Sequence, residues 1–215
     1  MNPALGIARS EFILGGQKSG KSRRAELLAR QWLDADTAHH AVLIATAQPW
    51  DDEMRQRIAR HQADRSVRVP GMRTVEEPLQ LARAIEQHSR ADTLVVVDCL
   101  TLWLTNCLMP AEVPSVEPLA AADALDSGLM EKNELNRPIE PVDIARAAPL
   151  LIAIAQASGP VVLVGNEIGL GVIPMGAQVR AFVDALGKLN QDVAATCQRV
   201  TLMAAGLPLT LKDKL

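Results

Sequence analysis

Near its start the chain reads Phe12-Ile13-Leu14-Gly15-Gly16-Gln17-Lys18-Ser19-Gly20-Lys21-Ser22. Three apolar residues lead into a glycine, and the segment matches G-x-x-x-x-G-K-[ST], a phosphate-binding loop between a strand and a helix. Gly15 and Gly20 let the backbone turn so that successive N–H groups point at phosphate oxygens. Lys21 can neutralise the β and γ phosphates, and the Ser22 hydroxyl can ligate the accompanying Mg²⁺. The alternative is a chance glycine turn, but every fixed position matches, so we predict a nucleoside triphosphate site.

Apolar segments on either side of this loop alternate between strand and helix patterns. Besides the strand that enters the loop, we expect strands at 41–45, 67–74 (the weakest), 93–98, 160–164 and 199–204, and an edge strand or hairpin partner at 207–212. We expect helices at 23–33, 49–65, 78–88, 100–108, 142–157 and 178–197, the first with Leu27, Leu28, Trp32 and Leu33 on its apolar side. Residues 1–10 are expected to be a leader and 165–176 a glycine-bearing loop. The alternation predicts an α/β fold, a parallel sheet with helices on both faces.

Composition limits the classes of protein that fit. The 215 residues suit one domain, 1–215, with a proline-rich excursion at about 110–141. A net charge of −3 and an aromatic fraction of 2% argue against nucleic acid partners. The apolar run 94–109 is broken by Asp98 and is too short to cross a membrane. Three cysteines without C-x-x-C spacing indicate reduced thiols, and we expect a cytoplasmic protein.

Asp98 is the first candidate site residue outside the loop. It ends the apolar strand 93–98, where a second Mg²⁺-holding motif is expected downstream of a phosphate loop. A helix-capping aspartate is the common alternative. Since the loop already requires a metal, we favour Asp98, together with Ser22, as the Mg²⁺ site.

His61 is the second candidate. Arg57 precedes it by four residues and Arg65 follows by four, so the three side chains share one face of the predicted helix. Guanidinium groups suit phosphate oxygens, and neighbouring positive charge favours a neutral imidazole that can attack phosphorus. The alternative is a solvated basic helix face, which spacing alone would favour.

Two acidic groups follow other strands. Glu76 and Glu77 can cap the next helix or contact a base or ribose. Asn166 and Glu167 follow the apolar segment 160–164, at a strand end where ligand clefts open in α/β proteins.

Seven further segments accompany the phosphate loop in a characteristic order: 44–48, Asp51-Asp52-Glu53-Met54, Arg57-Ile58-Ala59-Arg60-His61, 73–78, 97–101, 164–174 and 187–191. In this order they resemble the bifunctional adenosylcobinamide kinase/adenosylcobinamide-phosphate guanylyltransferase family of cobalamin biosynthesis. The loop alone is generic. The Asp-Asp-Glu-Met segment, the histidine helix and the Asn-Glu-x-Gly-x-Gly-x-x-Pro loop are specific.

The resemblance implies a P-loop NTPase with a RecA-like sheet and a homo-oligomer, expected to be a trimer. It implies that ATP or GTP phosphorylates adenosylcobinamide, and that GMP from GTP then passes through a guanylylated histidine, here His61, to adenosylcobinamide phosphate. It assigns catalysis to His61 and Lys21. It places nucleotide contacts on Gly15, Gly16, Gln17, Lys18, Ser19, Gly20, Lys21, Ser22, Thr46, Ala47, Gln48, Gln62, Ala63, Asp64, Arg65, Glu76 and Asp98.

Two other functions fit the phosphate loop. A P-loop kinase with a single activity on another small molecule would transfer phosphate without a GMP adduct. A regulatory NTPase switch would depend on a protein partner for turnover. The family resemblance provides most of the discrimination against both.

Overall fold

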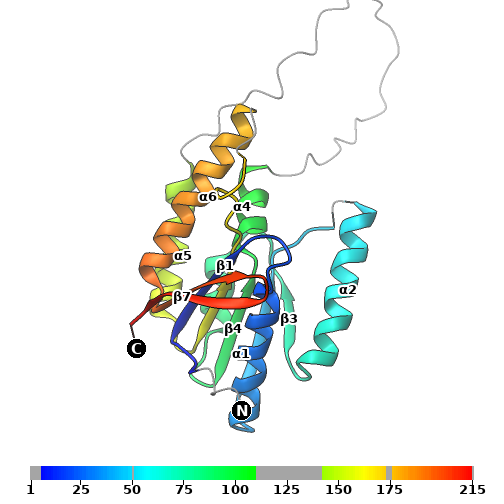
Figure 1. The fold of residues 1–215 in the computed structure, drawn as a ribbon. Helices are drawn as coiled ribbons and strands as arrows, with labels where there is room; N and C mark the ends of the chain where they lie inside the picture. Colours follow the sequence, from blue (N-terminus) through cyan, green and yellow to red (C-terminus); the bar gives the residue numbers. More distant parts are fainter. Residues whose placement is uncertain (1–5, 50, 110–141, 173–175, 215) are drawn as a thin grey trace, which may run out of the picture.

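The computed structural model describes residues 6–49, 51–109, 142–172 and 176–214. At its centre lies a seven-stranded sheet in the order β3-β2-β4-β5-β1-β6-β7 (Figure 1). Neighbouring strands are parallel except at one edge, where β7 pairs antiparallel with β6. The strands are β1 (Ser10–Gly15), β2 (His40–Ala45), β3 (Arg73–Glu76), β4 (Thr93–Asp98), β5 (Val161–Val164), β6 (Arg199–Ala204) and β7 (Leu207–Asp213). The helices are α1 (Lys21–Ala35), α2 (Asp52–Arg68), α3 (Leu81–His88), α4 (Leu100–Leu108), α5 (Val142–Gln156) and α6 (Ala177–Thr196).

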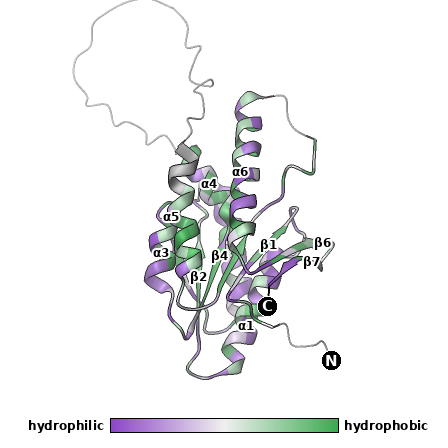
Figure 2. Cartoon of the chain, turned by 90° about the vertical axis from the view of Figure 1, so that its left-hand side faces the viewer, coloured by the Kyte–Doolittle hydropathy of each residue, from purple (hydrophilic) through white to green (hydrophobic). Residues whose placement is uncertain are grey.

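Helices cover both faces of the sheet. Successive strand residues point to opposite faces, so Phe12 is buried in a core shared with α3, α4, α5 and α6. Ile13, the next residue, is buried in a second core with Ala25 and Leu28 of α1. The strands are mostly apolar, and polar residues lie along the helices (Figure 2). This arrangement confirms the predicted α/β architecture.

Helix α2 is placed differently from the other helices. It stands beside β3, which is the edge strand of the sheet at the end opposite β7 (Figure 1). None of its 17 residues, all of which the structure describes, is buried. Asp51 caps its first turn, because the side chain accepts a hydrogen bond from the Met54 N–H at 2.7 Å. The helix predicted at 49–65 therefore begins and ends three residues later than expected.

Three expectations about local structure need correction. The strand predicted at 67–74, interrupted at Pro70-Gly71, is wrong before the interruption: α2 continues to Arg68, a turn lies at Pro70-Gly71, and β3 begins at Arg73. Leu27 was expected on the apolar side of α1, yet it is 51% exposed, whereas Leu28 is buried. Residues 1–10 are not all a leader, because β1 already begins at Ser10.

The helix predicted at 78–88 starts instead at Leu81. The Glu77 carboxylate accepts hydrogen bonds from the N–H groups of Leu79 and Gln80, the two residues before the helix.

The expectations for 110–141, for 173–175 and for the first five residues lie outside the described residues. β7 forms the predicted antiparallel edge, and Cys99 and Cys197 are buried thiols. Within the described ranges, no helix is both long and apolar enough to span a bilayer.

Candidate active site

The carboxyl ends of β1, β2, β4 and β5 meet at one edge of the sheet, where α/β proteins bind ligands. Backbone hydrogen bonds join the loops at this edge. The Glu167 N–H donates to the Gly15 carbonyl at 3.2 Å, and the Gly206 N–H donates to the Ser19 carbonyl at 3.0 Å. The phosphate loop after β1 is therefore held by the chain segments that follow β5 and β6.

The loop has the backbone conformation that its glycines allow. Gly15 has φ +150° and Gly20 has φ +102°, values that L side chains adopt rarely. Lys18 also has a positive φ of 55°. Helix α1 begins at Lys21, so its first N–H groups lie at the end of the loop, as an anion site requires.

Asp98 lies close enough to Lys21 to influence the pKa of the lysine. The Lys21 ammonium donates to the Gly16 carbonyl at 2.6 Å. Burial lowers the pKa of Lys21, Cys99 and Asp98 raise it, and Arg57 of α2 lowers it. The charge of Lys21 in the phosphate loop is thus influenced both by the carboxylate of Asp98 in β4 and by the guanidinium of Arg57 in α2.

The donors at this edge suit a hard cation such as Mg²⁺. Ser22 and Asp98 are half-buried and both offer oxygen, the ligand atom that Mg²⁺ prefers. Among the described residues, no three His, Cys, Asp or Glu side chains form a metal-binding group. A cation here would depend largely on phosphate and water oxygens, which is the usual arrangement for Mg²⁺ with a nucleotide.

Thr46 has a role that its sequence position did not reveal. It is fully buried, and its hydroxyl donates to the Cys99 carbonyl and accepts from the Cys99 N–H, both at 2.8 Å. Its carbonyl accepts from Asn106 Nδ2 at 2.8 Å. Thr46 therefore ties the end of β2 to the residue after β4, while Ala47 and Gln48 follow it as half-buried residues.

The predicted residues of α2 present one side toward this edge. Met54, Ile58 and Arg65 are half-buried and mark the side of α2 that faces the sheet. His61 is exposed and lies about 60° around the helix from Ile58 and about 40° from Arg65. Burial lowers the pKa of Arg65, and Asp98 opposes this more than any other charge.

Arg57 lowers the pKa of Lys21 and Asp98 raises that of Arg65, so these two arginines, each about one turn from His61 along α2, are within electrostatic reach of this edge of the sheet. Gln62, the next residue, donates to the Glu76 carboxylate at 3.4 Å. Gln62 and Glu76, both predicted to contact the nucleotide, are therefore in contact with each other. Ala63 and Asp64 are exposed.

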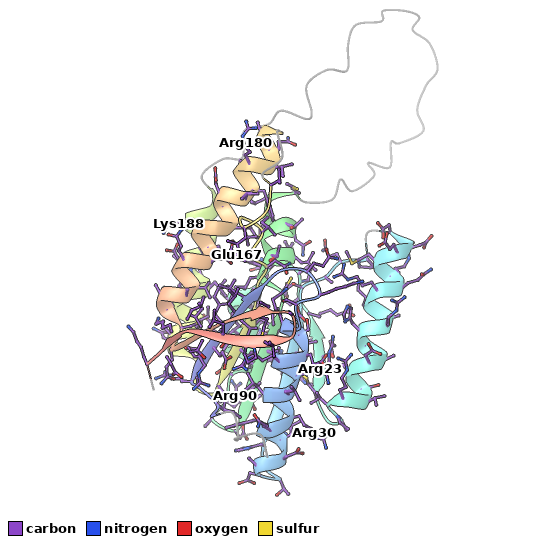
Figure 3. All side chains as sticks on the ribbon, viewed as in Figure 1. Arg23, Arg30, Arg90, Glu167, Arg180 and Lys188 are labelled. Atoms are coloured by element: carbon purple, nitrogen blue, oxygen red, sulfur yellow. The ribbon has the colours of Figure 1, made fainter. Side chains whose placement is uncertain are left out.

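Glu167 and Asn190 meet beside the phosphate loop, a contact that the sequence did not predict. The Glu167 carboxylate accepts from the Gly169 N–H at 3.3 Å and from Asn190 Nδ2 at 3.4 Å. It lies in the segment after β5, near the middle of the molecule (Figure 3). Asn190 is buried in α6 and also donates to the Asn166 carbonyl at 3.1 Å. In the sequence, only the position of Asn166-Glu167 after a strand indicates this part of the site. Asn190 could not be predicted, because it is 24 residues away from Asn166 along the chain.

Cys99, beside Asp98, is a poor candidate for a nucleophile. Burial raises the pKa of its thiol to about 11, so the thiolate is scarce at neutral pH. The imidazole of His61, by contrast, is exposed.

The sheet order, the phosphate loop after β1 and the carboxylate of Asp98 at the end of β4 define a P-loop nucleotide-binding protein of the RecA-like kind. Among solved structures, an ATPase domain matches with a TM-score of 0.50 and 12% identity, over 97% of this chain and 79% of that chain. This likeness concerns the fold.

The family model described as Cobinamide kinase / cobinamide phosphate guanyltransferase matches residues 11–211. The bifunctional adenosylcobalamin biosynthesis protein CobP of Pseudomonas aeruginosa is 41% identical over 95% of this chain and 98% of its own. The bifunctional adenosylcobalamin biosynthesis protein CobU of Escherichia coli K12 is 32% identical over 94% of this chain and 98% of its own. The chain belongs to the cobinamide kinase/cobinamide phosphate guanylyltransferase family. It is a transferase of cobalamin biosynthesis with these two activities, as the resemblance implied.

Proposed function

We propose that one nucleotide site, formed by the phosphate loop and α2, performs both reactions on adenosylcobinamide. The observation that carries the proposal is the electrostatic interaction of α2 with residues at the loop, which is attractive between Arg65 and Asp98 and repulsive between Arg57 and Lys21. Arg57 influences Lys21, Asp98 influences Arg65, and His61 lies between the two arginines on the same helix face. A triphosphate in the loop would then have its phosphorus atoms between Lys21 and His61.

In the kinase reaction, the loop N–H groups and Lys21 hold the triphosphate of ATP or GTP while its γ-phosphoryl group passes to the aminopropanol hydroxyl of adenosylcobinamide. Positioning and charge neutralisation supply most of the catalysis in such transfers. Ser22 and Asp98 would hold Mg²⁺, which when bound adds positive charge beside the phosphates.

In the guanylyltransferase reaction, a neutral ring nitrogen of His61 attacks the α-phosphorus of GTP. A P–N bond forms, the bond to the β-phosphate oxygen breaks, and pyrophosphate leaves. The phosphate oxygen of adenosylcobinamide phosphate then attacks the same phosphorus and displaces His61. Arg57 and Arg65 stabilise the charge that develops on the phosphate oxygens in both steps.

The remaining features of the proposal concern the whole protein. We infer that residues 1–215 form one domain, that the protein works in the cytoplasm, and that it neither binds nucleic acid nor inserts into a membrane. We further infer a homo-oligomer, with a trimer as the expected state. The exposed apolar side chains of Leu207, Leu209 and Leu211 on the edge strand β7 support an assembly.

The nucleophile assignment is tested with GTP labelled at the α-phosphorus. The wild-type protein should acquire acid-labile, covalently bound label, and His61→Ala should acquire none. His40→Ala is the matched control, because His40 is also exposed but lies at the amino end of β2, away from the phosphate loop. Label retained on His61→Ala would show that another residue is the nucleophile.

A further inference from the structure

Glu26 is an acidic residue of α1 that neither the phosphate loop nor the reaction chemistry accounts for. Its side chain is 9% exposed, although isolated buried carboxylates are costly. Burial raises the pKa of Glu26, and Arg68 and Arg65 lower it. The carboxylate lies 3.0 Å from Arg68 Nη1 and 4.0 Å from Arg65 Nε. A buried acid on the phosphate-loop helix is therefore paired with two arginines of the helix that carries His61.

The position of Glu26 in α1 connects it with the triphosphate site. Ser22, Glu26 and Arg30 follow one another at intervals of four residues, so they lie along one side of α1. Ser22 is at the phosphate end of this side. Arg30, one turn beyond Glu26, donates to the Arg68 carbonyl at 3.3 Å. The same side of α1 thus meets the phosphate loop at one end and α2 along the rest of its length.

None of the residues of α2 is buried, so side-chain contacts with neighbouring elements must hold this helix in place. Its side-chain contacts with the neighbouring elements come from its second half. Gln62 bonds to Glu76, Arg65 donates to Thr74 at 3.2 Å, and Arg65 and Arg68 pair with Glu26. Arg65 is one turn from His61, so the orientation of the imidazole depends on how Arg65 and Arg68 are held.

We propose that Glu26 is a positioning residue for guanylyl transfer: it holds α2 through Arg65 and Arg68 and thereby places His61 over the triphosphate. The proposal rests on the assignment of His61 as the nucleophile. Glu26 itself touches no reacting atom. Its removal should slow guanylyl transfer, whose nucleophile is carried by α2, much more than phosphoryl transfer, whose charge is neutralised by Lys21 and the loop, because small displacements of a nucleophile cost large factors in rate.

The experiment compares the two activities in Glu26→Gln. The rate of GMP adduct formation should fall about tenfold or more, with little change in the KM for GTP. Phosphorylation of adenosylcobinamide by ATP should fall less than about threefold, because the loop is intact. Asp34→Asn is the matched control. It removes the exposed α1 ion pair with Arg30, and both activities should remain at the wild-type level.

A second variant tests whether Glu26 acts through its ion pair with Arg68 of α2. Arg68→Gln should cause the same selective loss, and the double variant Glu26→Gln/Arg68→Gln should be no worse than either single variant, since both disrupt one interaction. Equal losses of both activities, normal adduct formation, or additive losses would overturn the positioning role.

His61→Ala is measured in parallel. If it keeps the label, the nucleophile assignment fails. If it loses the label while Glu26→Gln reacts normally, only the role of Glu26 fails.

Discussion

Gly15 and Gly16 are adjacent in the phosphate loop but differ in the space around them. A Cβ on Gly15 would lie 2.5 Å from the Met203 carbonyl oxygen and 2.6 Å from Ser19 Oγ, at a φ of +150°. A Cβ on Gly16 would meet no atom within 4 Å. The first glycine is required by the close approach of β6 to the loop, whereas the second faces open space.

Gly15→Ala should therefore be destabilised by about 1–3 kcal/mol, the usual effect of overpacking with backbone shifts. It should also bind GTP more weakly, because the loop N–H groups are displaced. Thermal unfolding and titration with a fluorescent GTP analogue measure the two effects. Gly16→Ala is the control and should change stability by less than about 1 kcal/mol. Equal stability of the two variants would contradict the contact with Met203.

At the level of elements, α1 and α2 are neighbouring helices that are stabilised differently. α1 buries Ala25, Leu28 and Ala29 against the sheet. α2 has no buried residue along its described length and is attached through polar contacts with α1 and β3. Helices gain most of their stability from the packing of an apolar face, so α2 is the less stable element although it is two residues longer.

Hydrogen exchange should distinguish the two helices. In the nucleotide-free protein, the amides of α2 should exchange at least about tenfold faster than those of the buried side of α1, because local opening of α2 exposes little apolar surface. Peptide-level mass spectrometry covers both helices in one measurement, which makes α1 the internal reference. If α2 is as protected as α1, then its polar attachments are stronger than the contacts suggest.

At the scale of the whole molecule, Glu11 joins parts of the chain that are distant in sequence. It is 1% exposed, and its Oε1 accepts from Arg24 Nε and Thr201 Oγ1, both at 2.9 Å. Arg199 lies 3.6 Å from Glu11 Oε2 and 3.1 Å from Asp213. The network connects β1, α1, β6 and β7, and so links the phosphate-loop helix to the antiparallel edge.

Glu11→Ala should lower the free energy of unfolding by about 3–5 kcal/mol, because the buried Arg24 loses its carboxylate partner and Arg199 loses one of its two. Urea denaturation monitored by circular dichroism measures the change. Asp34→Ala is the control: it removes the exposed ion pair between Arg30 and Asp34 within α1 and should cost less than about 1 kcal/mol. A similar small loss in Glu11→Ala would mean that the buried network contributes little to stability.

Much of the fold and part of the site could be predicted from local patterns. The segment 93–98 is predictable as a strand because residues 93–97 are β-branched or aliphatic. The segment 67–74 was misread, because two valines and a threonine favour a strand while the continuation of α2 depends on contacts with Glu26. Thr46, Asn106 and Asn190 were beyond sequence reasoning, since their hydrogen-bond partners lie 24 to 60 positions away.

The amino-acid sequence alone determined the phosphate loop, the alternation of strands and helices, and the family, because each depends on residue types at short, regular spacing. The tertiary structure decided which loops meet at the carboxyl edge of the sheet and how α2 stands beside the phosphate loop. It also paired Glu26 with Arg65 and Arg68, about 40 residues further along the chain. Such pairings arise only when packing brings distant segments together, and no local pattern of residues encodes them.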